Sequence, residues 1–198
     1  MKKVLSALLF VVFLLPTWKT EAQVVINAGY ILQQHTFNLN IVGDELKQQD
    51  SWMNGGFIGV SQNLPMFSRL ALAPGAYVSF SQAEGLAKGD DTAYTSDLSL
   101  KVPFYLNIKF EKIFVFGGPV FNVSLSTIRN LSSVANSSDI HFDMGATVGA
   151  GVMLGHFRLY AGYNCSLIDR ENFDYTTVRA YTAAWEGGTF MVGAGYSL

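Results

Sequence analysis

The sequence is short of cysteine and of charge, and each shortage excludes a class of protein. The single cysteine, Cys165, has no partner for an intramolecular disulfide, so the fold is not a disulfide scaffold. Charged residues make up 14% of the 198 residues, against about 25% in an ordinary soluble domain. Lysine and arginine form no cluster and the formal net charge is −2, so we expect no nucleic-acid partner.

Long apolar runs are missing as well. The longest, residues 4–15, has about twelve residues, whereas a helix that crosses a membrane needs about 20. Two lysines precede this run, Pro16 ends it, and the small residues Thr20 and Ala22 suit a signal-peptidase site. No cysteine follows the run to carry a lipoprotein anchor. We therefore predict a cleaved signal peptide over residues 1–22.

The mature chain, residues 23–198, is rich in glycine and aromatic residues that alternate. The whole sequence contains 19 glycines, 15 phenylalanines and nine tyrosines. In residues 142–154 and 190–198, large apolar residues alternate with glycine, threonine and serine, and a period of two indicates strands. Because the bulky face is apolar and the other face is small, the pattern predicts a narrow closed barrel in a lipid bilayer.

The alternation predicts eight strands within one domain. The strands are expected at about residues 24–37, 51–64, 69–82, 94–110, 113–126, 142–154, 157–168 and 181–198, with a bend or bulge at residues 117–119. The connections are alternately long (38–50, 83–93, 127–139, 169–180) and short (65–68, 111–112, 155–156). This rhythm is typical of outer-membrane barrels with short periplasmic turns. We therefore predict an all-β fold, an eight-stranded antiparallel up-and-down transmembrane β-barrel in the bacterial outer membrane.

Residues 94–110 alternate most clearly and assign the two faces. A lysine on the lipid face would cost roughly 2–4 kcal/mol near the midplane, so the parity of Lys101 must point inward. The residues predicted to face lipid are Leu98, Leu100, Val102, Phe104, Leu106, Ile108, Val148, Val152, Val192 and Tyr196.

Five charged residues share the inward parity: Asp97, Lys101, Lys109, Asp143 and Arg158. Charges inside a narrow barrel must be paired, because a buried lone charge is costly. We expect a lumenal polar network that plugs the barrel, with Asp143 paired to Lys101 or Arg158. The alternative is a small ion or solute path, although eight strands leave an interior that side chains fill.

Aromatic residues near the strand ends predict girdles at the two membrane surfaces. They are Tyr30, Trp52, Tyr94, Phe110, Phe142, Phe157, Tyr181, Trp185 and Tyr196. The alternative interpretation is the ordinary preference of aromatic residues for strands.

Three short motifs lie in neighbouring predicted strands: LKVPFYLN at residues 100–107, GGPVF at 117–121, and FDMG at 142–145 followed by GAG at 149–151. They resemble the motifs of the PorT-like outer-membrane β-barrel domain family of Gram-negative bacteria. The resemblance covers about residues 23–198 and implies an eight-stranded outer-membrane barrel, and some members of that family assist a secretion system. Such barrels often end in an aromatic residue, whereas this chain ends in Leu198 with Tyr196 in the aromatic phase.

The sequence offers little for catalysis. The three histidines are His35, His141 and His156, and only His141 has a nearby carboxylate, Asp139, and serines at 137 and 138. Triads are recognised by spatial geometry rather than by sequence proximity, so we interpret these residues as a hydrophilic rim. No metal-ligand spacing, phosphate loop or nucleophile elbow is present, and we expect no cofactor. Cys165, on the lipid-facing parity, is interpreted as an inert apolar residue.

The function predicted from these patterns is a structural or interaction role in the cell envelope. The expected partners are outer-membrane lipid, the barrel assembly machinery and an envelope or secretion protein, and we expect a monomer. The alternatives are a narrow channel for small solutes, a lipid-modifying enzyme and a soluble lipocalin-like binder. The long loops contain no recognisable motif, so the sequence does not identify a specific partner.

Overall fold

The computed structural model describes residues 22–39, 47–88, 91–129, 137–166, 181–184 and 188–198. Its strands are β1 (Gln23–Leu39), β2 (Lys47–Pro65), β3 (Leu70–Lys88), β4 (Asp91–Phe110), β5 (Ile113–Arg129), β6 (Ser137–Leu154), β7 (Phe157–Ser166), β8 (Tyr181–Ala184) and β9 (Thr189–Ser197). No helix in the described part of the chain is long and apolar enough to cross a membrane. The predicted signal peptide lies outside the described residues, apart from Ala22.

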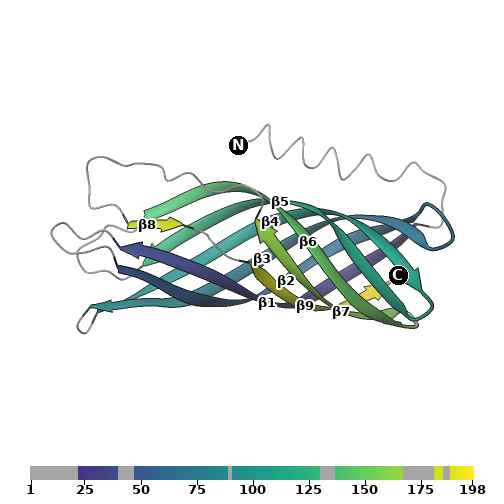
Figure 1. Ribbon diagram of the computed structural model, residues 1–198, viewed down its shortest axis with the longest axis horizontal. Coiled ribbons are helices and arrows are strands. Elements are labelled where there is room, and N and C mark those ends of the chain that lie inside the picture. The colour runs from purple at the N-terminus through teal and green to yellow at the C-terminus, as the bar shows by residue number, and fades with distance from the viewer. Residues whose placement is uncertain (1–21, 40–46, 89–90, 130–136, 167–180, 185–187) are drawn as a thin grey trace.

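The sheet closes on itself, because β1 pairs with β2 on one side and with β9 on the other. All neighbouring strands are antiparallel, and β2 to β7 follow one another in sequence order. β8 and β9 both pair with β1, so the two segments share the eighth position of the barrel (Figure 1). The predicted eight-stranded antiparallel up-and-down barrel is confirmed. Its last strand is described as two segments, β8 and β9, each of which pairs with β1.

The short connections lie at one end of the barrel, together with the start of β1 and the end of β9 (Figure 1). The β4–β5 turn is Glu111 and Lys112, and the β6–β7 turn is Gly155 and His156. The first residue of each turn has a positive φ, 52° at Glu111 and 65° at Gly155, as tight hairpins require. We refer to this end as the turn end and to the opposite one as the loop end.

Several strands run further toward the loop end than the alternation predicts. β2 begins at Lys47, β3 ends at Lys88 and β6 begins at Ser137, so parts of the predicted long loops are paired strand. Main-chain pairing needs no alternation of side chains, and it therefore continues where the apolar pattern stops. β4 has 20 residues, about twice the number needed to cross a bilayer.

The Gly-Gly-Pro sequence at residues 117–119 is not a bulge. The β4–β5 pairing is interrupted between the pairs Pro103–Val120 and Leu106–Gly117, but the register is the same on both sides. No extra residue is inserted, so of the two predicted alternatives, a bend or a bulge, the bulge is wrong. Prolines at 103 and 119 have no N–H to donate to the ladder, which accounts for the interruption.

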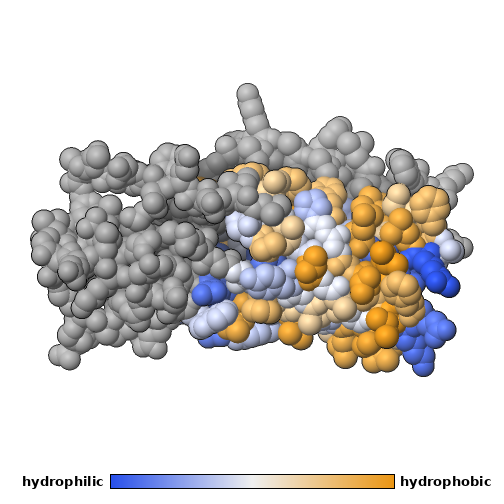
Figure 2. Space-filling model, in the orientation of Figure 1, coloured by the Kyte–Doolittle hydropathy of each residue, from blue (hydrophilic) through white to orange (hydrophobic). Residues whose placement is uncertain are grey.

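Alternate side chains point into the barrel or out of its wall, as the period of two requires. Small polar residues such as Ser79, Ser99 and Thr147 are buried inside. Large apolar side chains stand exposed on the outside, among them Ile58, with 61% of its surface accessible. Figure 2 shows apolar side chains covering the described wall toward the turn end, with hydrophilic residues at its tip. The wall is thus apolar over the height that a bilayer would cover.

Candidate functional site

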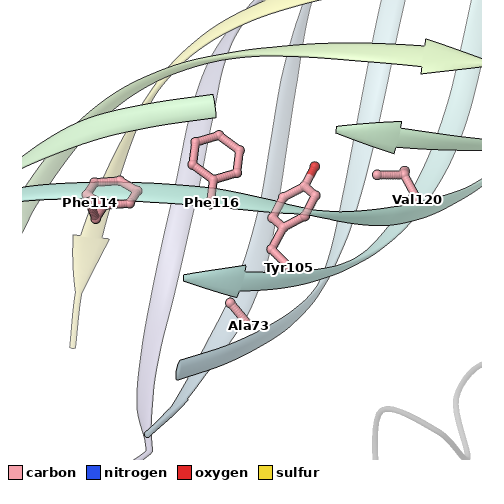
Figure 3. Close-up of a cluster of buried hydrophobic side chains, with 5 residues drawn as sticks. All are labelled: Ala73, Tyr105, Phe114, Phe116 and Val120. Carbon is pink, nitrogen blue, oxygen red and sulfur yellow. The ribbon is translucent and has the colours of Figure 1, made fainter. Parts of the chain in front are cut away.

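The centre of the barrel is filled by aromatic side chains (Figure 3). Tyr105 from β4 and Phe114 and Phe116 from β5 are at most 9% exposed and pack with Ala73 and Val120. The ring centroids of Tyr105 and Phe116 are 5.2 Å apart, and those of Phe114 and Phe116 are 6.0 Å apart. These separations are typical of favourable aromatic pairs.

Tyr160 extends the cluster to the far wall. It stands edge-on to Phe116, with ring centroids 5.8 Å apart, and its hydroxyl donates to Asn27 Oδ1 on β1 at 3.5 Å. The hydroxyl of Tyr105 donates to Thr147 Oγ1 on β6 at 3.4 Å. Rings from β4, β5 and β7 therefore meet across the interior, and we refer to Tyr105, Phe114, Phe116 and Tyr160 as the aromatic layer.

Glycines on the facing strands provide the space for these rings. A β-carbon at Gly149 would lie 2.3 Å from Cζ of Phe116, and one at Gly151 would lie 2.6 Å from Cε1 of Phe114. Real β-carbons do not approach other atoms this closely. The small face of β6 therefore receives the large side chains of β5, which explains why one wall of the lumen is glycine-rich.

Polar side chains above and below the aromatic layer are hydrogen-bonded to one another. Ser79 and Ser99 are joined at 2.6 Å between their hydroxyl oxygens, and Asn107 Nδ2 donates to Asn63 Oδ1 at 3.2 Å. Asn164 Nδ2 donates to Thr147 Oγ1 at 2.9 Å. Such pairing offsets the cost of burying polar groups. The described interior is therefore a packed core rather than an open pore.

The five charged residues predicted to form one lumenal network lie in two groups. Within β4, Lys101 and Lys109 are four residues to either side of Tyr105, so the aromatic layer separates them. Asp97, Lys101 and Asp143 line a cavity of 30 Å³ on the loop side. Lys109 and Arg158 line a cavity of 180 Å³ on the turn side.

The loop-side group brings opposite charges together. The carboxylates of Asp97 and Asp143 both act on the Lys101 ammonium, and Ser166 Oγ donates to Asp143 Oδ1 at 2.9 Å. Asp97 is 4% exposed. Of the two partners suggested for Asp143, Lys101 lines the same cavity and Arg158 lines the other one. Asn122 Oδ1, which also lines this cavity, is a buried acceptor without a donor among the described residues.

The turn-side group brings like charges together. Arg158 Cζ lies 6.0 Å from the ring centroid of Phe114, a cation–π contact between the guanidinium and the aromatic layer. The charge of Arg158 also acts on the Lys109 ammonium. None of the described residues that line this cavity is acidic. The prediction of a single charge network is thus replaced by a mixed group and a cationic group.

The aromatic layer was missed by the sequence analysis, although one pattern indicated it. Phe114 and Phe116 share the parity of Asn122 and Ser124 in β5, and Ser124 is buried inside. Tyr105 likewise has the parity of Lys101 in β4. An aromatic residue on the polar parity of a narrow barrel therefore indicates a lumenal ring, whereas hydrophobicity alone assigns it to the lipid face.

The ten residues predicted to face lipid all lie on the outer wall. Leu98, Leu106, Ile108, Val148, Val152, Val192 and Tyr196 are 40–65% exposed, and Leu100, Val102 and Phe104 are partly exposed. Monomeric soluble proteins rarely expose contiguous apolar area of this extent. It also argues against the lipocalin-like binder, which would need polar side chains here.

Six of the predicted girdle residues point outward: Tyr30, Trp52, Phe110, Phe142, Phe157 and Tyr196. The Tyr30 hydroxyl donates to Asn54 Oδ1, and the rings of Phe157 and Tyr196 meet edge to face at 5.0 Å. Trp185 and the side chains of Tyr94 and Tyr181 lie outside the described residues.

The described residues assemble no catalytic group around the histidines. His156 is exposed in its turn and its Nδ1 lies 3.1 Å from the Ser197 carbonyl oxygen. The side chains of His35, His141 and Asp139 lie outside the described part of the chain. Cys165 is exposed, and its thiol donates to the Ala146 carbonyl at 3.5 Å. No group of three metal-ligating side chains occurs within the described ranges.

Comparison with known proteins agrees with this architecture. A family model described as outer membrane protein beta-barrel domain matches residues 18–170. Ail, the attachment invasion locus protein of Yersinia pestis, is 14% identical with a TM-score of 0.52, over 90% of this chain and 100% of Ail. The structure of Ail in complex with the heparin analogue sucrose octasulfate is 13% identical in sequence with a TM-score of 0.53, over 90% of this chain and 100% of Ail. The outer membrane protein OprG of Pseudomonas aeruginosa is 14% identical with a TM-score of 0.57, over 89% and 96% of the two chains.

None of the curated proteins matches this sequence. Identities of 13–14% show a shared fold and no shared activity. The family model covers more than three quarters of the chain, and the structure is a closed antiparallel β-barrel with an apolar outer wall. The chain belongs to the outer membrane protein β-barrel domain family and is a protein of the bacterial outer membrane.

Proposed function

We propose that this barrel has a structural or interaction role in the envelope, performed by its outer wall and loop end, and that its lumen does not conduct. The observation that supports this proposal is the aromatic layer, whose rings reach from β4 and β5 to β7 across the interior. A hydrated path past these rings would require several buried side chains to move together. We assign the barrel no enzymatic role.

The partners we propose are the lipid of the outer membrane, the barrel assembly machinery and an envelope or secretion protein at the loop end. Tyr196, in β9, is exposed on the outer wall, where an aromatic side chain is accessible to the assembly machinery. Ail, a barrel of the same fold, is named for attachment and invasion, so this architecture is compatible with an interaction role. We propose that the barrel acts as a monomer.

We also propose that the chain is a PorT-like member of its family. The three motifs that resemble that group lie on β4, β5 and β6, which are neighbours in the sheet. Their inward residues include Tyr105 from the first motif, and Gly149 and Gly151, against which the rings of Phe116 and Phe114 pack. These motifs therefore build the lumenal core, and a secretion-associated role would reside elsewhere, in the loop end.

Conductance across a planar bilayer tests whether the lumen is closed. The wild-type barrel should give no stable conductance steps, whereas a variant with Tyr105→Ala, Phe116→Ala and Tyr160→Ala should give small ones. Phe157→Ala, which removes a ring from the outer wall, is the matched control and should stay silent. Wild-type steps as large as those of the triple variant would overturn the closed-lumen part of the proposal.

The interaction role is tested by genetic replacement. In a strain that lacks the gene, secreted proteins and resistance of the envelope to detergent are measured with and without complementation. A barrel in which residues 130–136 and 167–180 are replaced by short Gly-Ser linkers should insert normally yet fail to complement. Full complementation by this barrel would show that the role does not depend on those connections and would contradict the proposal.

A further inference from the structure

The turn-side cavity combines size, charge and polar donors in a way that the proposed function does not use. Its 180 Å³ is several times the roughly 30 Å³ that one water molecule occupies in the liquid. Phe114 of the aromatic layer and the turn residues Gly155 and His156 line it. The cavity therefore lies between the closed centre of the barrel and its turn end.

Lys109 and Arg158 both line this cavity, and none of the described residues that line it has an acidic side chain. Both are partly buried, and the charge of Arg158 acts on the Lys109 ammonium. Glu111, in the adjacent turn, is exposed and does not line the cavity. Like charges held together away from bulk water are unfavourable, and an anion between them relieves the repulsion.

The geometry of the cations suits an oxyanion better than a halide. The guanidinium of Arg158 lies over the Phe114 ring, with Cζ 6.0 Å from the ring centroid, and its planar fork can bind two oxygens of one group. Asn63 uses its carbonyl oxygen to accept from Asn107, so its NH2 group is available as a further donor. The cavity thus offers a fork, an ammonium and an amide to several oxygens of one ligand.

We propose that the turn-side cavity binds a phosphate group, held by Arg158 and Lys109 with Asn63 as an additional donor. Two sources of this chemistry reach the turn end of an outer-membrane barrel: free phosphate in the periplasm and the headgroups of the inner leaflet. Both are accommodated by the same cationic pair, and the experiment below distinguishes them.

The test uses the full-length mature barrel in maltoside micelles, which contain no phosphate. Inorganic phosphate is titrated against sodium chloride of equal ionic strength, and binding is followed by ³¹P line broadening and by the unfolding temperature. In parallel, a short-chain phosphatidic acid is titrated into the same phosphate-free micelles, with the corresponding diacylglycerol as the control. Saturable binding of inorganic phosphate would identify free phosphate as the ligand, and saturable binding of phosphatidic acid alone would identify a headgroup.

Lys109→Gln and Arg158→Gln should each weaken this binding at least tenfold. Lys112→Gln and Arg69→Gln remove exposed cations at the same end and should change it less than twofold. If Arg158→Gln fails to fold, as judged by its gel mobility before boiling, Lys109→Gln alone decides the outcome. The absence of saturable binding in both arms, or equal weakening by Lys112→Gln, would overturn the proposal.

Discussion

Tyr160 and Gly193 lie directly opposite each other in the β7–β9 ladder, and the tyrosine ring covers the glycine. A β-carbon at Gly193 would lie 2.6 Å from Cζ of Tyr160 and 2.9 Å from Cζ of Phe57. The ring of one strand therefore occupies the space that a side chain would fill at the glycine of the neighbouring strand. Such pairing of an aromatic residue with a glycine stabilises sheets. The same relationship recurs between β5 and β6 and builds the closed centre of the barrel.

Gly193→Ala should destabilise the barrel by roughly 1–3 kcal/mol, because the added methyl group overpacks the two rings. The measurement is urea unfolding in detergent micelles. In a Tyr160→Ala background the same substitution should cost clearly less, since one ring is gone and the two changes are coupled. Ala161→Val adds volume on the exposed outer wall and serves as the control. Equal costs of Gly193→Ala in both backgrounds would contradict this account of the packing.

Asp143→Ala should lower the thermal stability of the barrel. The change leaves Lys101 with one fewer carboxylate, and a buried charge that loses an opposite charge destabilises the folded state. The unfolding temperature in micelles measures the effect, with Lys112→Ala at the exposed turn as the control. Adding Lys101→Met should recover part of the loss, because the uncompensated charge is removed. An unchanged unfolding temperature for Asp143→Ala would eliminate the pairing.

A charge on the outer wall should be costly only where lipid surrounds it. Val148→Arg, at a site that is 65% exposed, should destabilise the barrel by roughly 2–4 kcal/mol in lipid vesicles if the site lies near the midplane. Phe67→Arg, in the turn between β2 and β3 and 72% exposed, should cost at most about 1 kcal/mol. Folding equilibria in vesicles give both values. Similar costs at the two sites would argue that the wall around Val148 does not contact lipid.

The mature protein should be heat-modifiable. A closed barrel whose strands all have paired neighbours resists unfolding by detergent at room temperature, so unboiled and boiled samples should migrate differently on a denaturing gel. The protein is extracted from membranes in mild detergent for this comparison. A single band position together with recovery in the soluble fraction would show that the faces of the barrel are reversed.

β4 and β5 differ in how well the sequence alone predicts which side chains face lipid and which face the lumen. In β4 the charge of Lys101 and the run of leucines assign both faces, and the structure has the same two faces. In β5 the rings of Phe114 and Phe116 are apolar yet point inward, where they are 5% and 7% exposed. Hydrophobicity does not distinguish a ring that faces lipid from a ring that is buried in the lumen, because both positions remove the ring from contact with water.

For the charged residues, too, the sequence predicts one property and leaves another undetermined. Their inward parity could be predicted, because a charge on the lipid face is costly. Their division into Asp97, Lys101 and Asp143 on one side and Lys109 and Arg158 on the other could not. It depends on which rings meet between them, and two of those rings, Phe116 and Tyr160, are 44 residues apart in the sequence.

The sequence by itself determined the eight strands, the faces of clearly alternating strands such as β4, and the two kinds of connection, because a period of two and the position of polar segments are local properties. Only the tertiary structure decided what fills the lumen and which charges meet. Closure of the barrel brings Tyr160 over Gly193 and Phe116 over Gly149, and the register that aligns a ring with a glycine is fixed by pairing along the whole ladder. A packed centre and a cationic cavity at the turn end follow from that register.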